Sequence, residues 1–429
     1  MTFHIQTFGC KVNSFESAAL AQMLLQAGYT VSEGYHNADI VVVNSCAVTS
    51  NSERKTHQFL RRVKQGNPGS IIVLTGCLPQ VGGDSADLMD IADIVTGTTH
   101  RDRIIPLIVR YCQDQSKSMF VEPLEGLPFE MLNPAIRPGH TRAFLKIEDG
   151  CDRYCAYCIV PHARGNVRSM PLGELEAQAV SLAGNGYKEI VLTGINLSMY
   201  GTDIGLTLAD ALEHVAAIAG IERVRLSSLE PDWVDESILE RLACCKKLCP
   251  HFHLVLQSGC DATLARMGRR YTCRQYLTVA DGIRSAFDAP TFTTDMIVGF
   301  PGETDRDFEE SMEFMQAMRY LKVHVFPYSP RPGTVAADMP DQIAARVRSQ
   351  RAKTLLASAN GVRLGVMGQY VGRTERMILE QRRDAVFTGY TDRYLPACVV
   401  ADSGHAAGDV VCGVIQSVED GVCRMISSG

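Results

Sequence analysis

The sequence predicts an α/β protein in three successive parts: an N-terminal open parallel α/β sheet, a central partial (β/α)6 barrel and a C-terminal small antiparallel β barrel. Short apolar runs alternate with longer helical patterns in residues 1–112 and again in residues 141–366, which is typical of parallel strands joined by crossover helices. Residues 367–429 hold short strand-like pieces separated by Gly, Asp and Ser, which is typical of a small barrel. The 429 residues suffice for about three domains of roughly 150 residues each.

The N-terminal part, residues 1–112, contains three apolar runs that we predict to be parallel strands: FHIQTF, DIVVVNS and SIIVLTG. Two longer helical patterns follow the first and second runs, and Ser14 and Ser50 are the expected N-caps of these helices. Residues 113–140 contain four prolines and little apolar periodicity, so we expect them to be a linker.

The central part, residues 141–366, contains six strand candidates separated by helix candidates. These strands are RAFLKIE, KEIVLTG, RVRLSS, HFHLVLQ, TFTTDMIVG and LKVHVFPYS. Six βα units predict an open version of a (β/α) barrel, whose active site lies at the C-terminal ends of the strands. A charged helical stretch then leads into the C-terminal part.

The composition argues against a membrane-spanning or secreted protein. No run of about 18 apolar residues is present, so we expect no membrane span, and the first residues lack the pattern of a signal peptide. A cytoplasmic location is therefore expected, where an odd count of 15 cysteines indicates metal binding or catalysis rather than disulfides. The net charge of −6 argues weakly against nucleic acid, although residues 61–64, 137–168 and 266–274 are locally basic.

The central cysteines have the spacing C-x3-C-x2-C, formed by Cys151, Cys155 and Cys158. Three thiolates this close can bind three irons of a [4Fe–4S] cluster and leave the fourth iron open to S-adenosylmethionine (SAM). Such a cofactor supplies radical chemistry, while the protein supplies position and shelter. Tyr157 is the aromatic residue expected near the adenine of SAM. The alternative is a zinc site, in which His162 would complete a Cys3His set.

Three further cysteines, Cys10, Cys46 and Cys77, each follow a short apolar run. If these runs are neighbouring parallel strands, the three thiols meet at the C-terminal edge of the sheet, where open α/β sheets bind ligands. From the residues alone, they are either metal ligands or structural thiols.

The chain resembles the methylthiotransferase branch of the radical SAM enzymes over essentially its whole length. The resemblance rests on motifs in a fixed order: TFGCKVN (7–13), VVNSCAVT (42–49), LTGC (74–77), LKIEDGCDRYCAYCIVPHARG (145–165), EIVLTGIN (189–196), RLSSLEP (225–231), HFHLVLQSGCD (251–261), TDMIVGFPGET (294–304) and HVFPYSPRPGT (324–334). It implies an N-terminal methylthiotransferase domain, a radical SAM barrel and a C-terminal RNA-binding barrel of the TRAM type.

The same resemblance implies a second [4Fe–4S] cluster on Cys10, Cys46 and Cys77. In this family the N-terminal cluster carries the added sulfur, which one SAM methylates. A second SAM, bound at the central cluster, generates the radical that removes a substrate hydrogen. The expected partners are therefore a tRNA anticodon stem-loop, an electron-donor protein and a sulfur source.

The motif at the first cysteine indicates the substrate. Lys11 and Val12 make TFGCKVN similar to the branch that acts at C2 of N6-threonylcarbamoyladenosine, next to the tRNA anticodon. The alternatives are isopentenyladenosine in tRNA, a ribosomal-protein aspartate and, more distantly, a non-catalytic protein that binds zinc and RNA. Val255, His162 and Asn196 depart from the family pattern near the expected SAM pocket.

Other polar residues at predicted strand ends are candidates for SAM contacts, although such groups often only cap loops. They are Thr193, Ser228, Gln257 and Asp295, with Gly194 and Gly299 allowing close backbone approach. Arg164 and Arg168 are candidates for substrate phosphates or the threonylcarbamoyl carboxylate, or else they form surface salt bridges. Because residues 367–429 hold more acids than bases, RNA binding there would need a local patch such as Arg373, Arg376, Arg382 and Arg383.

Overall fold

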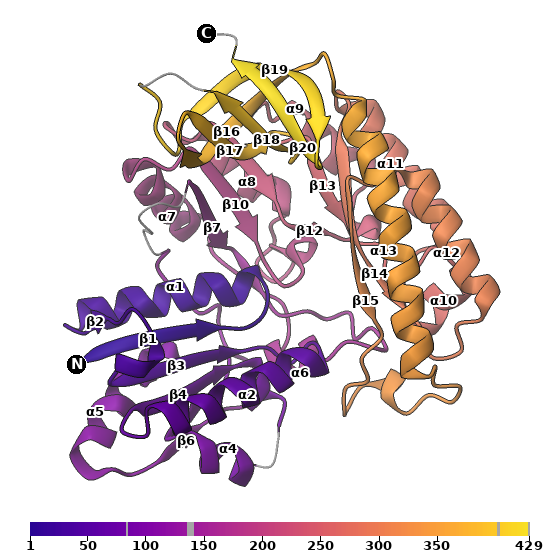
Figure 1. The fold of residues 1–429 in the computed structure, drawn as a ribbon. Helices are drawn as coiled ribbons and strands as arrows, with labels where there is room; N and C mark the ends of the chain where they lie inside the picture. The colour runs from indigo at the N-terminus through magenta and orange to yellow at the C-terminus, as the bar shows by residue number, and fades with distance from the viewer. Residues whose placement is uncertain (83–84, 135–140, 401–403, 428–429) are drawn as a thin grey trace. The chain divides into compact units, whose positions relative to one another are not determined.

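The computed structural model describes residues 1–82, 85–134, 141–400 and 404–427, and the chain divides into two compact units (Figure 1). The first unit comprises Met1–Ala135, Glu148–Met170 and Ser329–Ala337. The second comprises Ile136–Ile147, Pro171–Tyr328 and Asp338–Gly429. The predicted boundaries at residues 112, 140 and 366 follow the order of the sequence, whereas these units combine distant segments.

The first unit is built on a six-stranded parallel sheet in the order β2-β1-β3-β4-β5-β6. Its strands are β1 (Thr2–Thr7), β2 (Thr30–Val31), β3 (Ile40–Ser45), β4 (Ile71–Gly76), β5 (Ile94–Thr96) and β6 (Ser118–Phe120). Its other elements are α1 (Lys11–Gln26), η1 (Tyr35–Asn37), α2 (Ser50–Gly66), α3 (Cys77–Gln80), α4 (Ser85–Ile91), η2 (Arg101–Arg103), α5 (Ile104–Asp114), β8 (Glu148–Asp149), α6 (Val160–Arg164), β9 (Arg168–Ser169) and η5 (Val335–Ala337).

Both faces of this sheet are covered by helices, as expected for a parallel sheet whose strands are apolar throughout. Along β3, Val41 and Val43 pack with residues of α2 and α4. The alternate residues Ile40 and Val42 pack with residues of α1 and α5 on the opposite face. The continuous burial of β3 and β4 therefore follows from their central place in the sheet.

The structure corrects two predictions in this part of the chain. Cys10 and Thr49, rather than Ser14 and Ser50, are the N-cap residues of α1 and α2. The predicted linker contains β6, which pairs in parallel with β5 and extends the sheet. A strand of three residues is too short to produce a recognisable alternation among the prolines. Residues 135–140 of that predicted linker lie outside the described residues.

The second unit contains six consecutive strand paths that pair in parallel, as predicted for the partial (β/α)6 barrel. Its strands are β7 (Arg142–Lys146), β10 (Glu189–Thr193), β11 (Arg223–Leu226), β12 (Ser228–Leu229), β13 (His251–Leu254), β14 (Thr291–Val298) and β15 (Lys322–Pro327). Ser227 alone separates β11 from β12, so these two segments form one path that links the sheets β11-β10-β7 and β12-β13-β14-β15.

Helices follow most of these strands. They are α7 (Leu172–Gly184), η3 (Leu197–Met199), α8 (Leu208–Ala217), η4 (Pro231–Trp233), α9 (Glu236–Cys244), α10 (Asp261–Arg266), α11 (Cys273–Ala286), α12 (Asp305–Met318) and α13 (Ala345–Gly368). None of the helices in the described part of the chain combines the length and the apolar character needed to cross a lipid bilayer.

The C-terminal strands close into a five-stranded barrel in the order β16-β17-β18-β20-β19. They are β16 (Thr374–Arg383), β17 (Val386–Thr391), β18 (Pro396–Val400), β19 (Val410–Glu419) and β20 (Val422–Ser427). Four of the five pairings are antiparallel, as predicted, while β18 and β20 pair in parallel. Met367 and Tyr370, at and after the end of α13, belong to the barrel core.

The barrel packs against the N-terminal ends of the parallel strands within the second unit. Arg223, the first residue of β11, donates to the carbonyl of Thr391 at 3.0 Å and pairs with Asp392 at 3.1 Å. The ring of Tyr394 stacks on His251, the first residue of β13, with centroids 4.6 Å apart. The barrel therefore closes the edge opposite the C-terminal strand ends.

A buried carboxylate holds this edge together. Glu189 is fully buried and pairs with Arg223 and Arg225 at 2.8 and 2.9 Å. Burial alone would raise the pKa of Glu189, but Arg225, Arg223 and Arg142 hold it below its ordinary value. Both guanidinium groups also donate to carbonyls of the barrel. Arg223 donates to Thr391 at 3.0 Å, and Arg225 donates to Asp392 at 3.0 Å.

We predict that Glu189→Ala destabilises the protein by about 3–5 kcal/mol, because it leaves two buried guanidinium groups without their shared anion. Urea denaturation followed by circular dichroism measures the change. Arg306→Ala is the control, since Arg306 is exposed and its pair with Glu310 should contribute less than about 0.5 kcal/mol. Equal, small effects of both substitutions would show that the buried anion is not needed.

Candidate active site

The three strand-end cysteines are brought to one edge of the first unit's sheet by its topology. β1, β3 and β4 are adjacent and parallel, and Thr7, Asn44 and Thr75 are aligned in register near their ends. The chain reaches Cys10, Cys46 and Cys77 two or three residues later, so all three follow the same edge. Cys46 and Cys77 are buried, and Cys10 lies at the exposed rim.

Two glycines allow these strand ends to approach closely. Gly9 has φ +129°, and a side-chain carbon added there would lie 2.9 Å from Cβ of Cys46. Gly76 has φ +100°, and an added carbon would lie 2.5 Å from the carbonyl oxygen of Ser45. Because both positions combine a left-handed backbone with contact distances too short for a side chain, only glycine fits without distortion.

The thiols are close enough to affect one another's ionisation. Burial raises the pKa of the Cys46 thiol to about 12, and the negative charge of Cys77 adds to this rise. Although Cys10 lies at the rim, desolvation by the surrounding protein raises the pKa of its thiol as well; Arg164 opposes that rise and Cys77 adds to it. Thiolates in this position need a compensating cation, which a bound metal provides by displacing the protons.

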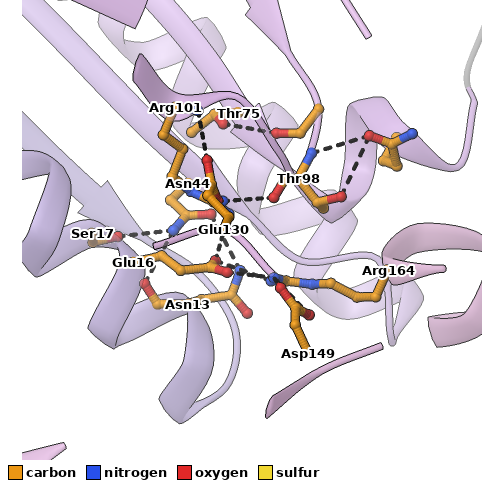
Figure 2. Close-up of polar contacts among 12 residues, drawn as sticks. Asn13, Glu16, Ser17, Asn44, Thr75, Thr98, Arg101, Glu130, Asp149 and Arg164 are labelled. Atoms are coloured by element: carbon orange, nitrogen blue, oxygen red, sulfur yellow. Dashed lines mark hydrogen bonds and ion pairs between the residues drawn. The ribbon is translucent and has the colours of Figure 1, made fainter. Parts of the chain in front are cut away.

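The amide side chains of Asn13 and Asn44 connect the start of α1 to the end of β3 (Figure 2). Asn13 Oδ1 accepts from the backbone N–H of Cys10 at 3.3 Å and from its thiol at 3.2 Å. Asn13 Nδ2 donates to Asn44 Oδ1 at 3.2 Å, and Asn44 Nδ2 donates to Ser17 Oγ at 3.0 Å. No motif in the sequence pointed to a role for these residues, although two polar residues, Asn44 and Ser45, at the end of an apolar strand are a signal for them.

The central cysteines lie in a loop of the same unit, between β8 and α6. The backbone N–H of Cys151 donates to the carbonyl of Gly165 at 2.9 Å, and that of Cys158 donates to the carbonyl of Cys155 at 2.9 Å. Cys155 is buried, whereas Cys151 and Cys158 are partly exposed, as is Tyr157. The loop is thus held by its own backbone at both ends.

The two sets of cysteines approach each other through α6. Cys77 packs in one apolar cluster with Ile159 and Ala163, and Ile159 directly follows Cys158. The alternative fourth ligand for zinc, His162, is exposed on the same helix and meets the ring of Tyr154 edge-on at 5.9 Å. The structure therefore joins two regions of the sequence that are more than 70 residues apart.

The SPRPGT segment also belongs to the first unit. Arg331 is buried and pairs with Glu53 of α2 at 2.7 Å. Ser329 Oγ accepts from the backbone N–H of Ser50 at 3.0 Å, and the N–H of Ala336 donates to the carbonyl of Ala156 at 2.7 Å. This segment connects the start of α2 to the central cysteine loop, a structural role that the motif alone did not reveal.

Arg164 and Arg168 lie in the protein interior. Arg164 forms a bidentate ion pair with Glu16, and both side chains are almost completely buried. Arg168 is also buried and lies 3.7 Å from the carboxylate of Asp149. This burial does not favour the predicted contacts with substrate, and the predicted alternative of surface salt bridges does not apply because both pairs are internal.

Apart from Tyr157 in the first unit, the candidates for SAM contacts lie in the second unit, in or shortly after its parallel strands. Thr193 ends β10 and Gly194 follows it, Ser228 lies in β12, and Asp295 lies in β14 with its carboxylate 3.5 Å from His253 Nε2. Gln257 bridges to Met296 and has φ +69°.

Gly299 has a structural role at the end of β14. Its φ is +71°, and an added side-chain carbon would lie 2.3 Å from Cγ of Arg348. Its N–H donates to both carboxylate oxygens of Glu303, at 3.0 and 2.9 Å. The glycine is thus needed for packing, and contact with SAM through its N–H would compete with Glu303.

Two arginines of the predicted RNA patch pair with acidic residues outside the barrel, within the second unit. Arg373 pairs with Asp288 at 2.6 Å, and Arg376 pairs with Glu222 at 3.4 Å. Arg382 lies over the ring of Phe387 at 5.4 Å, and Arg383 is exposed. The cationic surface available to a polyanion is therefore smaller than the sequence suggested.

Comparisons with known proteins agree with these features. A family model described as "Uncharacterized protein family UPF0004" matches residues 2–97, and a model of the radical SAM superfamily matches residues 145–315. Among solved structures, the radical S-adenosylmethionine methyltransferase TsrM from Kitasatospora setae is similar with a TM-score of 0.57 and 12% identity, over 77% of this chain and 74% of that chain. This likeness concerns the fold alone.

Curated relatives are similar over nearly the whole length. The Threonylcarbamoyladenosine tRNA methylthiotransferase MtaB of Thermotoga maritima is 37% identical, over 99% of this chain and 97% of the relative. The tRNA-2-methylthio-N(6)-dimethylallyladenosine synthase of Pelotomaculum thermopropionicum is 34% identical, over 89% of this chain and 87% of the relative. With its radical SAM region and these full-length relatives, the chain is an enzyme of the MtaB-like radical SAM methylthiotransferase family.

Proposed function

We propose that this enzyme adds a methylthio group to C2 of N6-threonylcarbamoyladenosine next to the anticodon of tRNA. The proposal rests on the TFGCKVN motif and on full-length similarity to relatives named for that substrate. Relatives named for dimethylallyladenosine are nearly as similar, so isopentenyladenosine is the rival substrate. The expected partners are the tRNA anticodon stem-loop, an electron-donor protein and a sulfur source.

The observation that carries the methylthiotransferase chemistry of this proposal, as distinct from its substrate, is the presence of two cysteine sets in one compact unit. Membership of the family implies SAM and iron–sulfur chemistry, and we infer two [4Fe–4S] clusters because there are two sets of three thiols. Cys10, Cys46 and Cys77 would hold one cluster, and Cys151, Cys155 and Cys158 would hold the other. When bound, these groups supply the electron for SAM cleavage and carry the sulfur to be transferred.

The residues fit such groups in their donor chemistry. The thiols of the first set lie where parallel strands end, and desolvation raises the pKa values of Cys10 and Cys46, so their thiolates would need the positive charge of a metal that displaces the protons. The amide of Asn13 orients Cys10 from below. We further propose that Tyr157, Thr193, Gly194, Ser228, Gln257, Asp295 and Gly299 contact SAM.

We also propose the functional domains that the sequence predicted. They are a cluster-binding domain at residues 1–112, a linker at 113–140 whose strand β6 extends the sheet of that domain, a radical SAM domain at 141–366 and a TRAM-like barrel at 367–429. Arg164 and Arg168 as substrate contacts have the least support, because both side chains are buried.

Mass spectrometry of tRNA nucleosides tests the substrate. Cells that lack the gene should lose 2-methylthio-N6-threonylcarbamoyladenosine and accumulate its precursor, and the wild-type gene should restore the product. The Cys155→Ala variant should not restore it. If that nucleoside persists and the methylthio form of isopentenyladenosine is lost instead, the substrate is isopentenyladenosine.

Iron content tests the two cysteine sets. The anaerobically reconstituted enzyme should hold about eight irons per chain, and Cys46→Ala or Cys155→Ala should each reduce this to about four. Cys112→Ala is the control, since this exposed cysteine lies in the same unit outside both sets. Full iron content in Cys46→Ala would exclude this thiol as a ligand.

A glycine substitution tests the geometry of the first set. Gly9→Ala should lower the iron content by about half, because its side chain would displace Cys46 and the amide of Asn13 that accepts from Cys10. Gly28→Ala also places an alanine at a positive φ, +87°, but nothing lies within 4 Å of an added carbon, so it should retain all the iron and lose only about 1–2 kcal/mol of stability. Similar iron loss in both variants would point to strain rather than to the approach of Cys46.

A further inference from the structure

A buried network of charged side chains lies in the first unit and includes Glu16, Arg101 and Arg164 (Figure 2). Glu16 of α1 is fully buried and contacts two guanidinium groups, those of Arg164 and Arg101, the latter at 2.8 Å. Asp149 lies 3.4 Å from Arg164, and Glu130 pairs with Arg101. Glu16, Arg101 and Arg164 therefore each pair with two groups of opposite charge.

Arg164 joins the segments that carry both cysteine sets. Its main partner, Glu16, lies on the helix whose N-cap is Cys10. Its other partner, Asp149, lies two residues before Cys151, and Arg164 itself lies at the end of α6, six residues after Cys158. Ala163, the preceding residue, packs in the same cluster as Cys77.

The guanidinium of Arg164 is a buried cation between the carboxylates of Glu16 and Asp149. Burial alone would lower the pKa of Arg164, but Cys77, Glu16 and Asp149 hold it well above its ordinary value, so the guanidinium stays charged. Its buried Nε has no hydrogen-bond acceptor among the described residues, which leaves one donor uncommitted.

We propose that Arg164 is a positioning residue of the Cys10–Cys46–Cys77 site, where its guanidinium, held by Glu16 and Asp149, balances the negative charge of a bound iron–sulfur cluster. This inference rests on the proposed function, because it requires a cluster on these thiols. A cluster with thiolate ligands gains negative charge on reduction, and a buried cation stabilises the more negative state. Arg164 therefore raises the reduction potential of that cluster, and Glu16 lowers it.

Because Arg164 and Glu16 carry opposite charges, their neutral variants should shift the midpoint potential in opposite directions. In full-length protein with Cys151, Cys155 and Cys158 changed to Ala, only the first site can hold a cluster, and redox titration followed by electron paramagnetic resonance gives its midpoint potential. Arg164→Gln should shift the midpoint to more negative values and weaken iron retention by about 10-fold. Glu16→Gln should shift it to more positive values.

Both variants keep partners for the residues that remain. In Arg164→Gln, Glu16 still pairs with Arg101, and in Glu16→Gln, Arg164 still has Asp149. Arg164→Lys retains the charge and should keep a midpoint close to that of the parent. Glu303→Gln combined with Arg351→Gln neutralises a buried pair of the second unit and is the matched control for a general effect of lost ion pairs.

The outcomes distinguish a failure of the role proposed for Arg164 from a failure of the two-cluster function. Opposite shifts in Arg164→Gln and Glu16→Gln, with no shift in the control, support the proposal. Unchanged midpoints, or shifts of the same sign in both variants, would overturn it while leaving the cluster assignment intact. If the parent protein holds no iron on Cys10, Cys46 and Cys77, the two-cluster function fails and this inference fails with it.

Discussion

The ion pair between Glu16 and Arg164 is the interaction on which the arrangement of the first unit depends. Two charges in the protein interior are stable only when each is fully paired, and breaking such a pair costs about 3–5 kcal/mol. Here the pair joins α1, which begins after Cys10, to α6, which follows the central cysteines. The position of one cysteine set is thereby coupled to that of the other, through residues 148 positions apart in the sequence.

A second constraint is the common direction of the strands. Because β1, β3 and β4 are parallel and adjacent, the residues that follow them collect at one edge of the sheet. Gly9 and Gly76 then allow the neighbouring strand ends to approach closely. The side chain of Asn13 accepts from the backbone N–H of Cys10, and that of Asn44 donates to the carbonyl of Asn13. The edge is thus shaped by backbone geometry first and by side-chain chemistry second.

The second unit uses its two strand edges differently. The N-terminal edge is closed by the C-terminal barrel through Glu189, Arg223 and the stacked rings of His251 and Tyr394. The polar residues proposed to contact SAM lie at the opposite ends of the strands, as is usual for (β/α) folds. Closing one edge with buried charges leaves the other available for ligands.

The sequence by itself determined the order of strands and helices, the six cysteines of interest and the family, because these depend on local periodicity and on motifs of fixed spacing. The strand β6 and the helix caps could not be predicted, since a three-residue strand and an Asn13 cap leave little trace in a single sequence. Only the tertiary structure decided the roles of Arg164 and Arg331. Arg164 was a candidate for substrate contact or a surface salt bridge, and Arg331 was only one position of a motif. Each is buried against a carboxylate that lies far away in the chain. Burial and partners are properties of packing between distant segments, so no local pattern records them.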